Sequence, residues 1–220
     1  MKNALVLAGA SAVGKTTVAT ALIEQTGGAF EIVRSLTTRK RRGDGFDGEY
    51  LYTDRDGFLS ELSLGRILEH TEYAGELYGT PLSEIERIRA VGKTPLLILD
   101  LVGVSAVSRR TDALSPCAVY LYCDLATVDS RLRRRYLRDE TDTAARARYE
   151  SRLAQNLRDF TSLPSRAQDF YAFLKNTDDP PSTAAKLHRV FESFCKGREK
   201  DRLANIAVAE ELRASVSGRQ

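Results

Sequence analysis

One segment near the N-terminus has the residue types and the spacing of a phosphate-binding loop. Residues 9–16 read Gly-Ala-Ser-Ala-Val-Gly-Lys-Thr and match the pattern G-x-x-x-x-G-K-[ST]. Glycines let backbone N–H groups approach a phosphate closely, and the start of the following helix adds partial positive charge. In this pattern the lysine reaches the β- and γ-phosphates, and the hydroxyl after it binds Mg²⁺. The segment therefore predicts a nucleoside triphosphate site. Its candidate residues are Gly9, Ser11, Val13, Gly14, Lys15, Thr16 and Thr17.

A second segment combines hydroxyl groups with positive charges. Residues 35–42 read Ser-Leu-Thr-Thr-Arg-Lys-Arg-Arg and follow a short apolar run. Guanidinium groups match phosphate oxygens in pairs, and hydroxyl groups supply further donors. A solvated basic loop is the alternative interpretation. The residues Tyr50, Glu69 and Tyr78-Gly79-Thr80 that follow favour instead a second site, for a phosphorylated substrate.

Arginine is concentrated again between residues 131 and 158, where nine arginines stand against four acidic residues. Three interpretations are open: a solvated helical face, a nucleic-acid grip, or a lid that closes over a triphosphate. Nucleic-acid binding usually needs a strongly basic domain with stacking aromatics, whereas the whole chain has a net charge of only +3. A lid suits phosphoryl transfer, which needs charge neutralisation and the exclusion of water. We therefore expect a lid, with most of the arginines solvated, and no nucleic-acid partner.

The composition is that of an ordinary globular protein. The 220 residues are 42% hydrophobic and 29% charged, and the length suits one domain or one domain with an insertion. The longest apolar runs are too short to cross a bilayer. Residues 1–3 lead directly into a short apolar run, which argues against a signal peptide. These features predict a cytoplasmic protein without a membrane partner.

The cysteines and histidines form no recognisable disulfide or metal pattern. Cys117 and Cys123 lie in one apolar run, where six strand steps separate them by about 20 Å. A disulfide needs Cα atoms within about 7 Å. The three cysteines lack a C-x-x-C spacing, and His70 and His188 have no paired ligand. We therefore expect reduced thiols in a cytosol and no metal site built from His and Cys.

Apolar runs alternate with helical patterns along most of the chain. Expected strands are Ala4–Ala8, Phe30–Val33, Leu96–Leu101, Ala118–Tyr122 and Phe170–Leu174. Expected helices are Lys15–Gln25, Pro81–Val91, Val104–Ala113, Leu125–Arg138, Arg148–Leu163 and Ser182–Phe194. Buried strands separated by helices predict an α/β fold with a mainly parallel sheet covered on both faces. Residues 35–80 interrupt this alternation, which indicates an inserted subdomain.

The two basic segments distinguish among the classes of protein that use a phosphate loop. A GTPase needs the guanine-reading sequence N-K-x-D, but residues 175–178 read Lys-Asn-Thr-Asp, with the first two in the wrong order. A motor ATPase needs a larger chain. A compact chain with two arginine-rich segments is better explained by a kinase that acts on a second phosphorylated substrate.

With these motifs in this order, the chain resembles guanylate kinase over about residues 3 to 194. The motifs are the phosphate loop, Ser35-x-Thr-Thr-Arg39-x-x-Arg42, Gly48-Glu49-Tyr50, Leu68-Glu69, Tyr78-Gly79-Thr80, Leu97-Ile98-Leu99-Asp100, Arg131-Leu132 with Arg135, and Arg152-Leu153. The resemblance implies a three-layer phosphate-loop NTPase fold with an inserted mixed-sheet monophosphate-binding subdomain and a helical lid. It also implies ATP- and Mg²⁺-dependent phosphorylation of a nucleoside monophosphate, most of all GMP or dGMP, with release of ADP.

The domain boundaries expected from this resemblance are a guanylate-kinase-like domain at 1–196 and a helical C-terminal extension at 197–220. Within the domain, the core is 1–34 and 81–196, the monophosphate-binding insertion is 35–80, and the lid is about 126–160. Small-molecule nucleotides are the expected partners, bound by a monomer or a homodimer.

The resemblance also assigns roles to individual residues. It implies a monophosphate site formed by Ser35, Arg39, Arg42, Tyr50 and Tyr78. Glu69 and Thr80 would read the guanine edge, where a carboxylate accepts from both N1–H and the 2-amino group. Asp100 would line the substrate site and support Mg²⁺ through water, together with Thr16. Catalysis would come from positioning and electrostatics, with the charges of Lys15, Arg39, Arg42, Arg135 and Arg152, and Arg146 and Arg148 as alternates in the lid.

Two positions depart from the family pattern. Val102 stands where a second aspartate usually contacts the purine, so a specialised kinase for another purine or a modified nucleotide is one alternative. Ala12 stands where glycine is common, and we expect an ordinary φ that tolerates alanine there. A non-catalytic binding module of the same family is a second alternative. Such modules typically have damaged phosphate loops, whereas Gly14-Lys15-Thr16 is intact.

Overall fold

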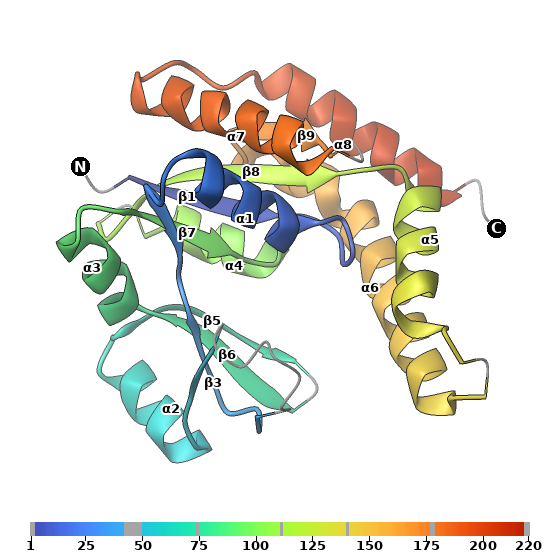
Figure 1. The fold of residues 1–220 in the computed structure, drawn as a ribbon, viewed down its shortest axis with the longest axis horizontal. Coiled ribbons are helices and arrows are strands. Elements are labelled where there is room, and N and C mark those ends of the chain that lie inside the picture. The colour runs from blue at the N-terminus through green and yellow to red at the C-terminus, as the bar shows by residue number, and fades with distance from the viewer. Residues whose placement is uncertain are drawn as a thin grey trace.

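The computed structural model describes residues 3–41, 50–73, 75–110, 112–139, 141–176 and 179–217. At its centre is a five-stranded sheet in the order β2-β7-β1-β8-β9, in which every pairing is parallel (Figure 1). The strands are β1 (Asn3–Ala8), β2 (Phe30–Ile32), β7 (Thr94–Ile98), β8 (Ser115–Tyr122) and β9 (Ala172–Lys175). The parallel sheet confirms the predicted α/β fold.

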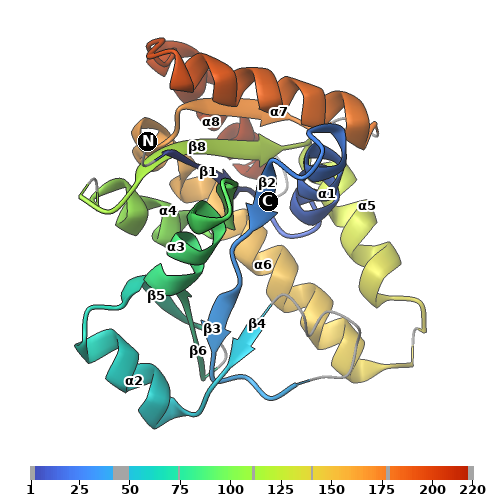
Figure 2. The ribbon, with the colours of Figure 1, turned by 60° about the vertical axis from the view of Figure 1, so that its left-hand side comes forward.

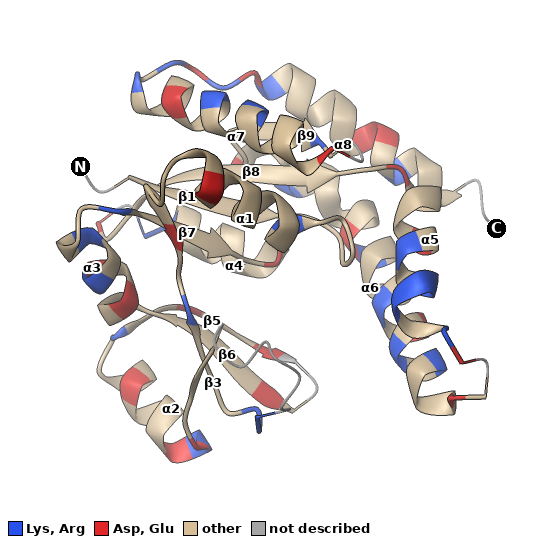
Figure 3. Ribbon diagram, viewed as in Figure 1, with Lys and Arg blue, Asp and Glu red and all other residues tan. Residues whose placement is uncertain are grey.

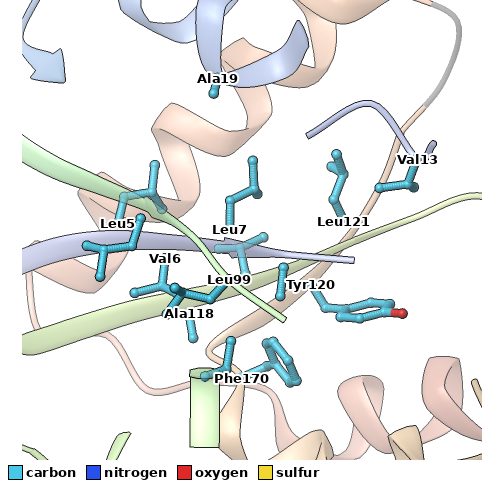
Figure 4. Close-up of a cluster of buried hydrophobic side chains, with 14 of the residues drawn as sticks. Leu5, Val6, Leu7, Val13, Ala19, Leu99, Ala118, Tyr120, Leu121 and Phe170 are labelled. Atoms are coloured by element: carbon cyan, nitrogen blue, oxygen red, sulfur yellow. The ribbon is translucent and has the colours of Figure 1, made fainter. Parts of the chain in front are cut away.

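The central strands are apolar on both faces because helices cover both. Helices α1 (Lys15–Gln25) and α7 (Pro180–Cys195) pack against each other over one face. Helix α4 (Leu101–Ser108) lies on the other face, with α6 (Thr143–Arg166) beside it. Figure 4 shows Ala19 of α1 on one side of β1 and the ring of Phe170, which contacts buried Tyr120, on the other. Alternate side chains of a strand point to opposite faces, so both helical layers are packed onto one continuous core.

The chain between β2 and α3 (Leu82–Ala90) forms a second, smaller sheet, which is set apart from the first (Figures 1 and 2). Its order is β4-β3-β6-β5, formed by β3 (Ser35–Thr37), β4 (Tyr50–Tyr52), β5 (Ile67–Tyr73) and β6 (Glu76–Pro81). The β3–β4 pairing is parallel and the other two are antiparallel, which makes the sheet mixed. Helix α2 (Arg55–Ser63) covers it with the buried ring of Phe58.

Helices α5 (Leu125–Tyr136) and α6 form a pair beside the carboxyl ends of the central strands. Each begins after an aspartate whose carboxylate accepts a backbone hydrogen bond: Asp124 from Thr127 N at 2.8 Å and Asp142 from Ala145 N at 2.8 Å. The Tyr149 hydroxyl of α6 donates to Asp129 of α5 at 2.5 Å and ties the two helices together. Figure 3 shows that lysine and arginine are concentrated along this pair.

The last helix, α8 (Arg202–Ser217), packs against α6. Ala209 and Leu212 bury its inner face, whereas Leu203 is exposed. The buried amide of Asn205 donates to the carbonyl oxygens of Phe170 at 3.1 Å and Tyr171 at 3.4 Å. The chain after residue 200 is therefore attached to the same face of the domain that carries α6.

Several elements begin or end at other residues than the sequence predicts. The strand expected at Leu96–Leu101 ends at Ile98, because the Asp100 carboxylate accepts from Gly103 N at 2.7 Å and starts α4 at Leu101. Helix α6 begins at Thr143, since Asp142 caps it, and continues past Pro164 to Arg166. The last strand begins at Ala172, because the short helix η2 (Ala167–Asp169) precedes it.

None of the described helices combines the length and the apolar character that crossing a membrane requires. The three cysteines are free thiols: Cys117 and Cys123 are buried and Cys195 is exposed. Burial raises the pKa of the Cys117 thiol, which keeps that thiol protonated and chemically inert.

Candidate active site

The phosphate loop joins β1 to α1, and two of its glycines are required by the backbone. Gly9 has a φ of +149°, and a Cβ added there lies 2.2 Å from the carbonyl oxygen of Leu121. Gly14 has a φ of +99°, and a Cβ there lies 2.7 Å from the Asn176 amide nitrogen. No residue with a side chain fits either position without displacing its neighbours. The two glycines of the motif therefore let the loop pass close to β8 and to Asn176.

Ala12 does not have the ordinary backbone that we expected for it. Its φ is +67°, and no other non-glycine residue has a positive φ in the described part of the chain. The expectation was wrong because the loop keeps its left-handed turn even where the sequence supplies a Cβ. That conformation costs an L-residue about 1–2 kcal/mol.

Lys15 lies at the start of α1 and turns back over the loop. Its ammonium group donates to the carbonyl oxygens of Gly9 at 2.7 Å and Ala10 at 3.1 Å. Burial lowers the pKa of Lys15 to about 8; nearby Asp159 and Asp100 oppose this effect, and nearby Arg152 and Arg135 add to it. The two lid arginines proposed for catalysis, Arg135 and Arg152, therefore both act on the charge of this lysine.

A cleft of about 660 Å³ opens over the loop. Its walls carry the positive charges of Lys15, Arg131, Arg134, Arg135 and Arg138, and no acidic residue lines it among the described residues. The remaining lining residues are Ser11, Ala12, Gly14, Thr16, Thr17, Asn176 and Pro180. Such a cleft suits a polyanion with the charge of a triphosphate. Val13, another residue of the loop, is buried. The alternates Arg146 and Arg148 lie elsewhere on α6, and Arg148 forms an ion pair with Asp142 at 3.6 Å.

Asp159 also belongs to this charge cluster and is not among the site residues predicted from the sequence. Its carboxylate accepts from Gln155 Nε2 at 2.8 Å. Burial raises the pKa of Asp159, and nearby Lys15 opposes that shift. The signal in the sequence is the separation of seven residues from Arg152, because two turns of helix bring residues i and i+7 to one face.

The small sheet brings together four of the residues proposed for the monophosphate. Ser35 of β3 is paired with Tyr50 of β4, and the rings of Tyr50 and Tyr78 lie 6.2 Å apart between centroids. The Arg39 guanidinium lies 4.9 Å from the centre of the Tyr50 ring. Arg39 Nη1 is buried without a hydrogen-bond partner among the described residues. A buried donor in that state is suited to an anion.

Two further residues bear on this second site, and the structure describes one of them. Tyr52, which sequence reasoning missed, approaches Arg39 Nη2 through its hydroxyl at 3.4 Å. Its position two residues after Tyr50 places both rings on one face of β4 and was the available signal. Arg42, proposed for the same site, lies outside the described residues.

Glu69 and Thr80 meet in the interior of the small sheet. The Thr80 hydroxyl donates to Glu69 Oε1 at 2.6 Å, and both residues are buried. Burial raises the pKa of Glu69 to about 7, the Thr80 hydrogen bond lowers it, and nearby Asp100 raises it. Asp100 acts on the pKa of both Glu69 and Lys15. Asp100 therefore lies near enough to both the proposed base-reading pair and the lysine of the phosphate loop to influence their charges.

The first turn of α4 lies against the Oε2 oxygen of this carboxylate. A Cβ added at Gly103 lies 3.1 Å from Glu69 Oε2. The adjacent Val102, at the position where the family pattern has aspartate, keeps 53% of its surface exposed. An apolar side chain is therefore presented to solvent one residue from the contact with Glu69.

The oxygen donors near the phosphate loop suit Mg²⁺. Thr16 is exposed at the start of α1 and contributes a hydroxyl to the cleft. One carboxylate oxygen of Asp100 caps α4, which leaves the other oxygen for a hydrated cation. No group of three His, Cys, Asp or Glu residues able to hold a metal is found among the described residues. A hard cation held by one carboxylate, a hydroxyl, waters and substrate phosphates is the usual arrangement for Mg²⁺, and these residues fit it.

The comparisons with known proteins agree with this geometry. Residues 1–177 match the family model for guanylate kinase. A guanylate kinase of Lactobacillus delbrueckii subsp. bulgaricus is 38% identical over 135 residues, which are 60% of this chain and 64% of that protein. The match thus covers less than two thirds of the length of that relative. A guanylate kinase of Latilactobacillus sakei is 26% identical over 86% of this chain and 88% of its own.

Among solved structures, a guanylate kinase from Anaplasma phagocytophilum has a TM-score of 0.60. It is 23% identical over 87% of this chain and 85% of its own. That likeness establishes the phosphate-loop kinase fold, while the family model covers well over half of the chain. The chain belongs to the guanylate kinase family.

Proposed function

We propose that the chain transfers the γ-phosphate of ATP to GMP or dGMP and releases ADP and the nucleoside diphosphate. The observation that carries this proposal is the buried Glu69–Thr80 pair, joined electrostatically through Asp100 to Lys15 of the phosphate loop. A guanine nucleotide kinase needs a carboxylate that reads the base close to a lysine that binds the triphosphate. Glu69 and Lys15 meet this requirement, since Asp100 influences the pKa of both.

ATP binds in the basic cleft. The loop N–H groups and the ammonium of Lys15 hold its outer phosphates, and the positive walls neutralise their charge. Arg135 and Arg152 supply further positive charge from the lid as the γ-phosphoryl group moves. These roles rest on the location of both arginines in the electrostatic environment of Lys15.

The monophosphate binds to the small sheet. The buried Arg39 Nη1 takes one of its oxygens, and Ser35, Tyr50 and Tyr78 surround it. Glu69 accepts hydrogen bonds from N1–H and the 2-amino group of guanine, a donor pair that adenine does not offer. A wrong base leaves this buried carboxylate without its partners, which is the strongest kind of polar discrimination. Arg42 is assigned to the same site by its place in the motif.

The transfer needs no general base, because a monophosphate oxygen is already a nucleophile. The protein positions the two phosphates in line and surrounds them with fixed charges. Mg²⁺, held by Thr16 and through water by Asp100, supplies charge neutralisation at the phosphates when bound. The two half-sites lie on separate sheets, so we propose that the insertion 35–80 and the lid 126–160 close over the substrates.

One observation favours a second candidate within the same class. Val102 is exposed in the turn that contacts Glu69 and brings no polar group to the purine. A kinase specialised for another purine or a modified base is therefore the alternative. A non-catalytic module is disfavoured by the intact Gly14-Lys15-Thr16. We further propose a cytoplasmic protein that acts as a monomer or homodimer.

A panel of monophosphates in an assay of ADP release tests the proposal. With ATP and Mg²⁺ present, GMP and dGMP should be turned over with kcat/KM at least about 100-fold above AMP, CMP and UMP. If a modified purine is turned over and GMP and dGMP are inert, the specialised kinase is correct. Turnover of none, with ATP still bound, identifies a binding module.

A further inference from the structure

The strained phosphate loop is held from the lid helix by one fully buried amide. Asn156 of α6 is 0% exposed. Its Oδ1 accepts from the backbone N–H of Ser11 at 2.7 Å, and its Nδ2 donates to the Ser11 carbonyl oxygen at 3.2 Å. One side chain thus pairs with both backbone polar groups of the residue that precedes Ala12.

The residue on the other side of Ala12 is fixed as well. The Val13 carbonyl oxygen accepts from Asn176 Nδ2 at 2.6 Å and from Arg131 Nη1 at 3.1 Å. Ala12 therefore lies between two anchored residues with its φ at +67°. A residue keeps a disfavoured backbone conformation only where contacts with the surrounding structure hold it in place.

We propose that Asn156 is a positioning residue of the phosphate loop, whose amide holds Ser11 so that Ala12 keeps the left-handed conformation needed to bind the nucleotide phosphates. Asn156 acts through Ser11 and does not itself line the cleft. The inference rests on the proposed function only in that the loop binds a nucleotide. It also makes the lid helix part of the phosphate site, since Asn156 lies one turn after Arg152.

The expected size of the effect follows from the backbone of Ala12. The left-handed region is less favourable for an L-residue by a factor of about 5 to 30. Without the Asn156 amide, a smaller fraction of the protein has the loop in its binding conformation. The apparent affinity for the nucleotide is reduced in proportion to that fraction. A glycine at position 12 has no such preference, so it makes the loop less dependent on Asn156.

The chain offers a matched control for the loss of a buried amide. Asn205 of α8 is also buried and also donates to two backbone carbonyl oxygens, but these belong to Phe170 and Tyr171 and not to the phosphate loop. Asn156→Leu and Asn205→Leu make the same chemical change. Both should lower thermal stability, whereas only the first should affect nucleotide binding.

The experiment measures ADP binding by titration calorimetry without GMP, for the parent, Asn156→Leu, Asn205→Leu, Ala12→Gly and the double variant Ala12→Gly/Asn156→Leu. We expect Asn156→Leu to weaken ADP binding about tenfold and Asn205→Leu to change it less than about twofold. In the Ala12→Gly background, the loss caused by Asn156→Leu should shrink at least about fivefold. GMP affinity, measured separately, should be unaffected by Asn156→Leu.

Equal ADP affinity in Asn156→Leu and the parent overturns the inference, as does an equal loss in both backgrounds. If circular dichroism shows Asn156→Leu to be unfolded, Asn156→Ala replaces it in the same cycle. Failure of the parent itself to bind ADP contradicts the proposed function instead, so the two failures are distinguishable.

Discussion

Replacement of Glu69 by glutamine should make the protein more stable and less able to bind GMP, and both effects depend on pH. The carboxylate is 8% exposed and accepts a hydrogen bond from the Thr80 hydroxyl at 2.6 Å, and a backbone hydrogen bond from Thr80 also stabilises its charged form. Burial raises its pKa from 4.5 to about 7. Glutamine has the same shape and keeps an acceptor for Thr80, but carries no charge that burial penalises.

The stability effect has a definite sign. Because the folded protein holds the Glu69 proton more tightly than the unfolded chain, stability falls as pH rises from 4.5 through about 7. A pKa difference of about 2.5 corresponds to about 3 kcal/mol. At pH 8, Glu69→Gln should therefore be more stable than the parent by up to about 3 kcal/mol. Below about pH 4.5 the two proteins should be equally stable.

GMP binding should follow the opposite trend. Only the ionised carboxylate accepts from both N1–H and the 2-amino group of guanine. With a pKa of about 7, about 90% of the parent is ionised at pH 8 and about 3% at pH 5.5, so its GMP affinity should fall about 30-fold between them. Glu69→Gln should bind GMP at least about 100-fold more weakly at pH 8. Its remaining dependence on pH should be that of the GMP phosphate, whose second ionisation lies at about pH 6, without the additional change of about 30-fold that Glu69 gives the parent.

Urea unfolding and GMP titration calorimetry between pH 4.5 and 8 measure the two trends. Glu72→Gln is the matched control, because Glu72 lies on the same strand but is exposed and pairs with Arg55 at 3.8 Å. It should change neither property. A parent whose GMP affinity is constant from pH 5.5 to 8, or a Glu69→Gln protein no more stable than the parent at pH 8, refutes the reasoning.

Three further predictions concern the loop and the junction between the sheets. Lys15→Met should reduce turnover at least about 1,000-fold with an unchanged circular dichroism spectrum, and substantial turnover by the variant contradicts the assigned role. In the parent, kcat/KM for ATP should fall above about pH 8, where Lys15 loses its proton. Gly9→Ala should lower stability by more than about 3 kcal/mol in urea unfolding, because its Cβ meets the Leu121 carbonyl at 2.2 Å; an unchanged midpoint refutes this. Glu84 accepts from Arg34 Nη2 at 2.8 Å and its pKa is lowered to about 2 by that bond. Glu84→Gln should therefore cost about 2 kcal/mol at pH 7, and this difference should disappear as pH falls from 4.5 towards 2; a cost that persists at pH 2 shows that charge is not its origin.

Local sequence signals predict the parts of the structure that depend on neighbouring residues. Helix α1 begins at Lys15 and ends at Gln25 as predicted, because the loop glycines and the helical pattern both lie within a few residues of it. The parallel order of the central strands follows from their continuous apolar character. The start of α4 was predicted three residues late because the cap by Asp100 was not recognised.

The conformation of Ala12 depends on contacts between distant parts of the chain. Asn156 and Ser11, which hold it on one side, are 145 residues apart in sequence. Such a contact appears only when α6 has folded over the loop, so no local pattern predicts it. Asp159 and Tyr52 are intermediate cases, since helical and strand periodicity place each beside a predicted residue. The structure describes nothing of Arg42, whose role stays a prediction from the motif.

Transfer of a labelled γ-phosphate tests the central claim most directly. ATP labelled at the γ-phosphate is incubated with GMP, Mg²⁺ and the protein, and the products are separated by anion exchange. The account predicts that the label appears in the β-phosphate of GDP, one for each ADP formed, and that Lys15→Met abolishes this transfer. Label that remains in ATP, or that appears as inorganic phosphate while GMP is unchanged, would contradict it.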